Sequence, residues 1–83
     1  MKAMKPQRML TLFSKNVLRL RQEAGMTQEA LAKRCTKYKR QIPKIENGTA
    51  EVNLSMIFTL AQALEVDPAT LLKESPVSGY HNR

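Results

Sequence analysis

Apolar residues in this chain recur three and four positions apart, in short runs that each end at a helix-stopping residue. Pro6 is tolerated near the start of a helix, and Gly25 can end one in a left-handed conformation. Between them lie four apolar residues whose spacing places them on one face of a helix: Leu10, Phe13, Val17 and Leu20. No segment shows a strand-like alternation, so the sequence predicts an all-α fold.

A second helix is predicted directly after Thr27, whose hydroxyl can accept a hydrogen bond from a backbone amide of the new helix. Leu31 and Cys35 lie four residues apart and are expected to face inward. Cys35 is therefore interpreted as a small core residue rather than as a reactive thiol.

The segment 36–38 is short and polar, and it is interpreted as a turn before a third helix. Ile42 and Ile45 are expected to turn this helix toward the core, and Asn47-Gly48 is expected to stop it. The polar side chains left outside are Lys39, Arg40, Gln41 and Lys44.

A fourth helix is predicted from the cap Asn53 to about Leu64. It is apolar nearly all round, so it should be covered on more than one side. Asp67-Pro68 then has the pattern of a cap followed by a first-turn proline, which predicts a short fifth helix through Leu71 and Leu72.

At 83 residues, the chain is long enough for one domain. We expect that domain over 1–74, with a flexible start within 1–8 and a loose tail over 75–83. No apolar stretch approaches the roughly 20 residues that span a bilayer. The basic N-terminus lacks the apolar stretch of a secretory signal, so we expect a cytoplasmic protein.

The composition also argues against several kinds of site. A single cysteine cannot form an internal disulfide, and with the lone His81 it cannot build a zinc site. The sequence shows no phosphate-cradling glycine loop and no carboxylate pair with an obvious cleft. We therefore expect no metal, no cofactor and no enzymatic activity.

Charge is distributed unevenly along the chain. Residues 1–44 hold twelve Lys and Arg against two Glu, a net +10, whereas residues 45–83 hold two against five acids, a net −3. No acid lies within 33–44, which contains Lys33, Arg34, Lys37, Lys39, Arg40 and Lys44. Such a block favours a polyanionic partner, because bound phosphates release counterions. A solvated helical face or a membrane-surface helix would carry the same pattern.

Several short motifs at fixed spacing, from roughly Val17 to Leu72, together resemble the phage repressor and Cro-like (XRE) helix-turn-helix family. The residues that carry the resemblance are Arg21, Gly25, Thr27-Gln28-Glu29, Leu31-Ala32, Ile42, Ile45-Glu46-Asn47-Gly48 and Leu60-Ala61-Gln62-Ala63-Leu64-Glu65-Val66. The resemblance implies a compact five-helix, lambda-repressor-like domain that binds double-stranded DNA, with the third helix in the major groove.

The resemblance also implies roles for individual residues. Gln28 would lie at a phosphate, together with the start of the second helix around Thr27. Base contacts would come from Arg40, which suits guanine, and Gln41, which suits adenine. The full set implied to face DNA is Thr27, Gln28, Lys37, Tyr38, Lys39, Arg40, Gln41, Lys44 and Asn47, of which Lys37, Lys39 and Asn47 fit backbone contacts. Arg21 and Glu46 would instead form a structural ion pair.

Two residues depart from the family pattern. Pro43 falls within the third helix, where it is harmless only in the first turn, which needs no backbone donors. The helix therefore either begins late, after a looser stretch over 38–41, or kinks. Thr36 also replaces the usual turn glycine.

Two copies on a palindromic operator would read two half-sites, so we expect a homodimer acting as a repressor or autoregulator. The candidate interface residues are Val66, Leu71, Leu72, Val77 and Tyr80, and their alternative role is in the domain core. The alternative function is that of an antitoxin or adaptor whose main partner is a protein such as a cognate toxin.

Overall fold

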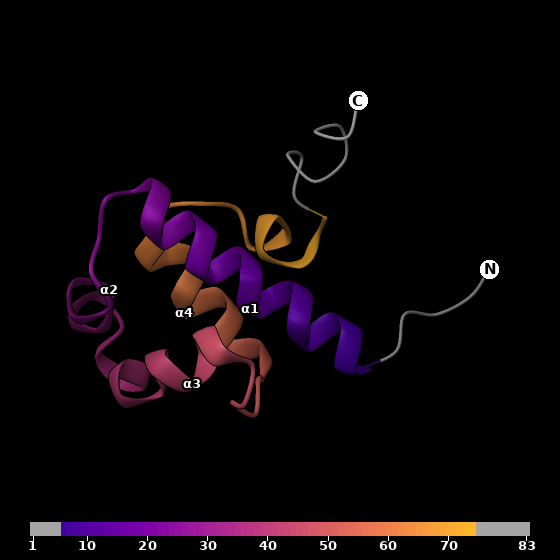
Figure 1. Ribbon diagram of the computed structural model, residues 1–83. Helices are drawn as coiled ribbons and strands as arrows, with labels where there is room; N and C mark the ends of the chain where they lie inside the picture. Colours follow the sequence, from indigo (N-terminus) through magenta and orange to yellow (C-terminus); the bar gives the residue numbers. More distant parts are fainter. Residues whose placement is uncertain (1–5, 75–83) are drawn as a thin grey trace.

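The computed structural model describes residues 6–74, which form a helical fold without β-strands in that range (Figure 1). The prediction of an all-α fold is confirmed. The elements in chain order are α1 (Pro6–Glu23), α2 (Gln28–Arg34), the 3-10 helix η1 (Thr36–Gln41), α3 (Ile42–Asn47), α4 (Leu54–Leu64) and the 3-10 helix η2 (Pro68–Leu72). Residues 6–8, expected to belong to a flexible start, are the first residues of α1.

The long helix α1 is the element around which the others pack. It contacts α3, α4 and η2, and it crosses the molecule in front of α4 in the view of Figure 1. Phe13 and Val17, from its predicted apolar face, are almost completely buried. They meet Leu31 of α2, Ile45 of α3 and Leu60 of α4 in a single core. The fold therefore holds α3 against α1, and α2 is held by its packing on η1, α3 and α4.

Side-chain caps fix where the helices begin. Thr27 Oγ1 accepts from the backbone N–H of Ala30 at 3.0 Å. Asn53 Oδ1 accepts from Met56 at 2.8 Å, and the carboxylate of Asp67 caps η2 in the same way. At the other end of α3, Gly48 adopts a left-handed conformation with φ of 82°. These are the start and stop signals that the sequence analysis used.

The predicted fifth helix is one short 3-10 helix rather than an α-helix. Leu71 within it is fully buried in the core, so it cannot contribute to a dimer interface as expected. Val66 is half-buried against the core, while Leu72 is exposed. The other two interface candidates, Val77 and Tyr80, lie outside the described residues.

The helix α4 is only partly covered. Leu60, Ala61 and Leu64 are buried, but Leu54 and Phe58 remain exposed, contrary to the expectation that other elements cover it on more than one side. No helix within residues 6–74 is long and apolar enough to cross a lipid bilayer.

Candidate nucleic-acid interface

The segment between α2 and α3 explains how the chain accommodates Pro43. η1 occupies residues 36–41 and is interrupted by Tyr38, whose φ and ψ of −115° and 17° are not helical. Helix α3 starts only at Ile42, which places Pro43 in its first turn. Because a first turn needs no intrahelical donors, the proline interrupts no hydrogen bond. Of the two alternatives, a late helix start is therefore correct.

This geometry makes Pro43 replaceable. We expect Pro43→Ser to fold and to bind DNA, with a change in the free energy of unfolding of about 1 kcal/mol or less, because proline is exposed and fits its position without being required there. Urea denaturation together with a DNA-binding titration checks this. Loss of folding in this variant would show that the proline itself holds η1 and α3 in place.

Most of the basic side chains expected to face DNA form one exposed surface. Lys37, Lys39 and Arg40 are exposed on η1, and Lys44 is exposed on α3. A hollow of about 360 Å³ lies over η1 and is lined by Thr36, Lys37, Lys39, Arg40 and Gln41. The exposed end of the helix-turn-helix is therefore hollowed over η1 and positively charged, and positive charge is what attracts phosphates.

Tyr38 differs from the expectation that it faces the DNA groove. It is only 9% exposed and belongs to the core, while Lys37 Nζ lies 5.4 Å from the centre of its ring. Its hydroxyl donates to Asn53 Oδ1 at 3.4 Å. A hydrogen bond with Ser55, and secondarily the charge of Lys37, lowers the pKa of Tyr38. The backbone of Tyr38 interrupts η1, and its ring lies in the core. Through its hydroxyl, the tyrosine links η1 to Asn53 at the start of α4.

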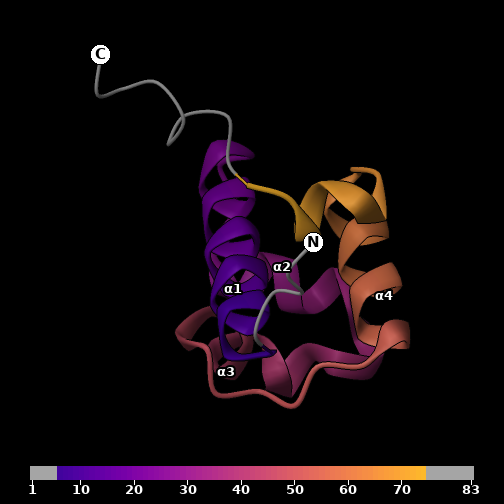
Figure 2. The same ribbon diagram turned by 90° about the vertical axis from the view of Figure 1, so that its right-hand side faces the viewer.

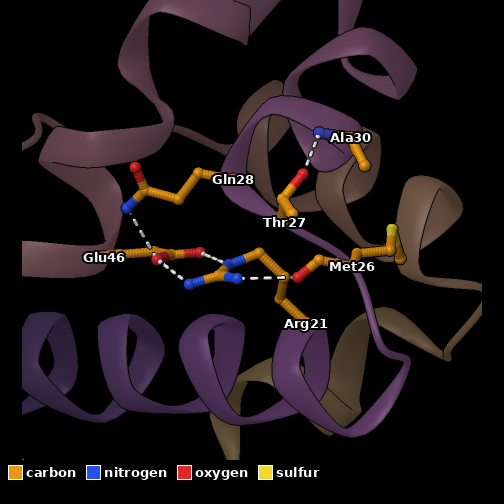
Figure 3. Close-up of polar contacts among 6 residues, drawn as sticks. All are labelled: Arg21, Met26, Thr27, Gln28, Ala30 and Glu46. Carbon is orange, nitrogen blue, oxygen red and sulfur yellow. Dashed lines mark hydrogen bonds and ion pairs between the residues drawn. The ribbon is translucent and has the colours of Figure 1, made fainter.

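Arg21 and Glu46 form the expected ion pair, which Figure 3 shows with its neighbours. Arg21 Nε and Nη2 donate to the two carboxylate oxygens of Glu46 at 2.5 and 2.9 Å. Arg21 Nη1 donates to the Met26 carbonyl at 2.7 Å. The side chains are only 12% and 4% exposed, and the hydrogen bonds that Arg21 donates to Glu46 raise the pKa of Arg21. The pair ties α1 to the end of α3 and to the loop before α2.

Gln28 joins this network, which the sequence analysis did not anticipate. Its Nε2 donates to Glu46 Oε1 at 2.9 Å (Figure 3). A primary amide carries two N–H donors, so this contact uses one of them and orients the other. No local pattern indicates this contact, because Gln28 and Glu46 lie 18 residues apart on different helices.

The remaining two residues of the implied DNA surface have structural partners. Thr27 uses its hydroxyl oxygen to cap α2. Asn47 Oδ1 accepts from the backbone N–H and the hydroxyl of Thr49, at 3.1 and 2.6 Å. Both side chains are exposed at the ends of helices in the helix-turn-helix.

Asn16 has a structural role that was not predicted from the sequence. Asn16, on the inward face of α1, is 1% exposed, and its Nδ2 donates to the carbonyls of Leu71 and Lys73, both at 2.8 Å. It fastens η2 and the following segment to α1. The available signal was a polar residue beside the core position Val17, inside an otherwise apolar face.

Comparisons with known proteins agree with this geometry. A helix-turn-helix family model matches residues 17–71, which is more than half of the chain. The control protein C.BamHI from Bacillus amyloliquefaciens is 39% identical over 62 residues, covering 74% of this chain and 76% of the relative.

A solved structure shares the fold. The restriction-modification controller protein C.AhdI from Aeromonas hydrophila superposes with a TM-score of 0.69 at 32% identity, over 75% of this chain and 94% of the other. The family consists of DNA-binding regulators rather than enzymes. The chain therefore belongs to the XRE-type helix-turn-helix family of DNA-binding transcriptional regulators.

Proposed function

We propose that this protein is a controller-type transcriptional regulator that binds a palindromic operator as a homodimer, with η1 and the start of α3 in the major groove. The observation that carries the proposal is the exposed basic surface of η1 and α3, since residues 33–44 contain no acid. A surface with that charge attracts phosphates. It lies on the second half of the helix-turn-helix, which is the half that enters the major groove of DNA in this motif.

Within this surface, Arg40, Gln41 and Lys44 are proposed to read base edges. Arg40 and Lys44 are exposed, and Gln41 is half-buried beside the first turn of α3. The burial of Tyr38 removes its ring from the set of base readers and leaves these three long polar side chains. Each bidentate base contact is worth roughly 1–3 kcal/mol of discrimination.

Contacts to the DNA backbone are proposed for the residues around Arg40, Gln41 and Lys44. Lys37 and Lys39 supply charge, and the second amide donor of Gln28 supplies a directed hydrogen bond to a phosphate. Thr27 and Asn47 lie at helix ends on the same motif. These contacts fix the register of the protein without reading the sequence.

The names of the two relatives suggest a biological setting. One is a control protein and the other a restriction-modification controller, so we place this chain in the control of a restriction-modification system, acting on cytoplasmic DNA. The antitoxin or adaptor alternative is not retained, because neither the family match nor the two relatives supports a toxin partner.

Footprinting on the DNA upstream of the protein's own coding region tests the proposal. We expect a protected palindrome whose binding weakens steeply with salt, because several phosphates release counterions. Arg40→Ala should weaken binding of the homodimer to that operator by roughly 30-fold or more, because one contact of roughly 1–3 kcal/mol is lost in each of the two half-sites, and it should relax the preference at one base pair of each half-site.

A matched control is Lys15→Ala, which removes an exposed positive charge from α1 instead. We expect it to leave base preference unchanged. Absence of protection at low salt, or equal effects of the two substitutions on sequence preference, would contradict the proposed interface.

A further inference from the structure

The segment η1 carries two of the three residues proposed to read base edges, yet its own hydrogen bonds fix it only weakly. A 3-10 helix has poorer hydrogen-bond geometry than an α-helix, and η1 is interrupted at Tyr38. Side chains cap α2, α4 and η2, but within residues 6–74 no side chain caps η1 or α3. The orientation of η1 toward DNA therefore depends on contacts with the rest of the domain.

Tyr38 is the residue that attaches η1 to the hydrophobic core. It is the single buried side chain within residues 36–41, and the other five are exposed or half-buried. Its backbone N–H donates to the carbonyl of Cys35 at 2.7 Å, which ties it to the end of α2. The depth at which η1 lies on the domain is therefore set by the ring of Tyr38.

The hydroxyl of Tyr38 adds a second point of attachment, at the start of α4. It donates to Asn53 Oδ1 at 3.4 Å, and the same oxygen accepts from the backbone N–H of Met56 at 2.8 Å. Asn53 is thus held by the helix that it caps. In Figure 2, the segment between α2 and α3 passes close to the lower end of α4, where this helix begins. Two attachment points, the ring and the hydroxyl, restrict the rotation of η1 as well as its depth.

Two residues of the proposed DNA-facing surface lie beside Tyr38. Lys37 Nζ is 5.4 Å from the centre of its ring, within the range at which an aromatic face attracts a cation. Lys37 and Gln41 line the hollow over η1, and both also line a second hollow of about 330 Å³ that includes Tyr38 and Asn53. A shift of Tyr38 would therefore move a proposed phosphate contact and a proposed base reader together.

We infer that Tyr38 is a positioning residue for operator recognition, which holds η1 so that Lys37 and Gln41 meet DNA in register, while its own side chain contacts no base. The inference rests on the proposed function, because it assigns the residue that orients the proposed reading surface. Side chains that recognise a ligand by paired hydrogen bonds must be held to within about 0.5 Å of the productive geometry. The ring and hydroxyl of Tyr38 supply that constraint where capping side chains do not.

Tyr38→Phe tests this role, because it removes the hydroxyl and keeps the ring. We expect the full-length variant to fold and to melt close to the wild type by circular dichroism. Its affinity for the operator found by footprinting should fall by about threefold at each half-site, or roughly tenfold for the homodimer, because one hydrogen bond no longer holds the reading surface. The preference at the base pair that Gln41 contacts should relax. Affinity for a random duplex should be unchanged, since the charges that bind phosphates are the same.

Asn53→Ser probes the other end of the same hydrogen bond. Serine caps a helix about as well as asparagine does, but its side chain is one bond shorter and does not reach the hydroxyl of Tyr38. This variant should also lose affinity for the operator and not for the random duplex. The double variant should bind no more weakly than the single ones, because both substitutions remove one interaction. Thr11→Val, which removes an exposed hydroxyl from α1, is the matched control and should bind both duplexes as the wild type does.

Three results would overturn the positioning role. Tyr38→Phe could bind the operator with the affinity and base preference of the wild type. It could lose affinity equally for both duplexes, in which case Tyr38 only stabilises the fold. The losses of Tyr38→Phe and Asn53→Ser could add in the double variant, in which case the two residues act separately.

The wild type distinguishes failure of this inference from failure of the proposed function. If the wild type does not prefer the operator to the random duplex, the proposed function is wrong and the positioning role is excluded with it. If the wild type and Tyr38→Phe prefer the operator equally, only the positioning role is wrong.

Discussion

Replacing Arg21 with alanine is expected to lower the free energy of unfolding by roughly 3–5 kcal/mol, because the substitution leaves the carboxylate of Glu46 buried without its cation. The side chain of Glu46 is 4% exposed, and both of its oxygens accept from Arg21. A small domain has a total stability of only about 5–15 kcal/mol, so the substitution should remove a large share of it and lower the melting temperature clearly.

Urea denaturation followed by circular dichroism measures this loss. Arg8→Ala is the matched control, since Arg8 also pairs with a glutamate, Glu74, but both side chains are more than half exposed. Exposed pairs are worth little, so the control should unfold almost as the wild type does. Removing both Arg21 and Glu46 should cost less than the two single losses added together.

A different result would change the assignment of Arg21. If Arg21→Ala melts as the wild type does but prefers a different operator sequence, then Arg21 contacts bases and the pair is not structural. The orientation of Gln28 gives a second measurement, because Gln28 donates to the same carboxylate. Loss of that acceptor in Glu46→Ala should weaken operator binding even under conditions where the variant is fully folded.

The helices of this protein could be predicted because their boundaries are local events. Thr27, Asn53 and Asp67 each cap the helix that follows, using a side chain and a backbone amide two or three residues away. Gly48 ends α3 in a left-handed conformation that glycine adopts at little cost. None of these interactions depends on the rest of the fold.

The side chains that turned out differently depend on distant neighbours. Tyr38 was expected to face the DNA groove, but its own backbone is not helical and its ring lies in the core. Leu71 and Phe58 are both apolar residues in the second half of the chain, yet the packing of η2 on α1 and α4 buries the first, whereas the second is 53% exposed. Periodicity shows that a face is apolar, whereas the partner that covers it is a tertiary property.

The exposed basic surface was predictable in outline for a related reason. The block of basic residues over 33–44 is a property of the sequence and survives in the fold as an exposed surface. The contact between Gln28 and Glu46 is not local in sequence, because it joins α2 to α3 across η1. The sequence shows which positions are charged or polar, but it does not show which of these side chains contact one another.

Asn16→Ala is expected to lower the free energy of unfolding by roughly 2–4 kcal/mol, because two carbonyl oxygens lose their donor where water has poor access. Asn16 donates to Leu71 and Lys73 and thereby fastens η2 to α1. Gln62→Ala removes an amide from an exposed position of α4 and serves as the control, with an expected change below about 0.5 kcal/mol.

Asn16→Asp separates this hydrogen-bonding role from simple packing, since the two side chains have nearly the same size. The oxygen that replaces Nδ2 would face two carbonyl oxygens in a buried position, which raises the pKa of the new carboxyl group in the folded state. Arg19 Nη2, which donates to Asn16 Oδ1 at 3.3 Å, offsets only part of this rise, because its side chain is partly exposed. A raised carboxyl pKa means that the folded protein binds a proton more readily than the unfolded chain does. Relative to the wild type, this variant should therefore be least stable at neutral pH and recover as the pH falls through that raised pKa. If Asn16→Asp is as stable as the wild type at both pH 7 and pH 4, then Asn16 acts by filling space and not by donating to η2.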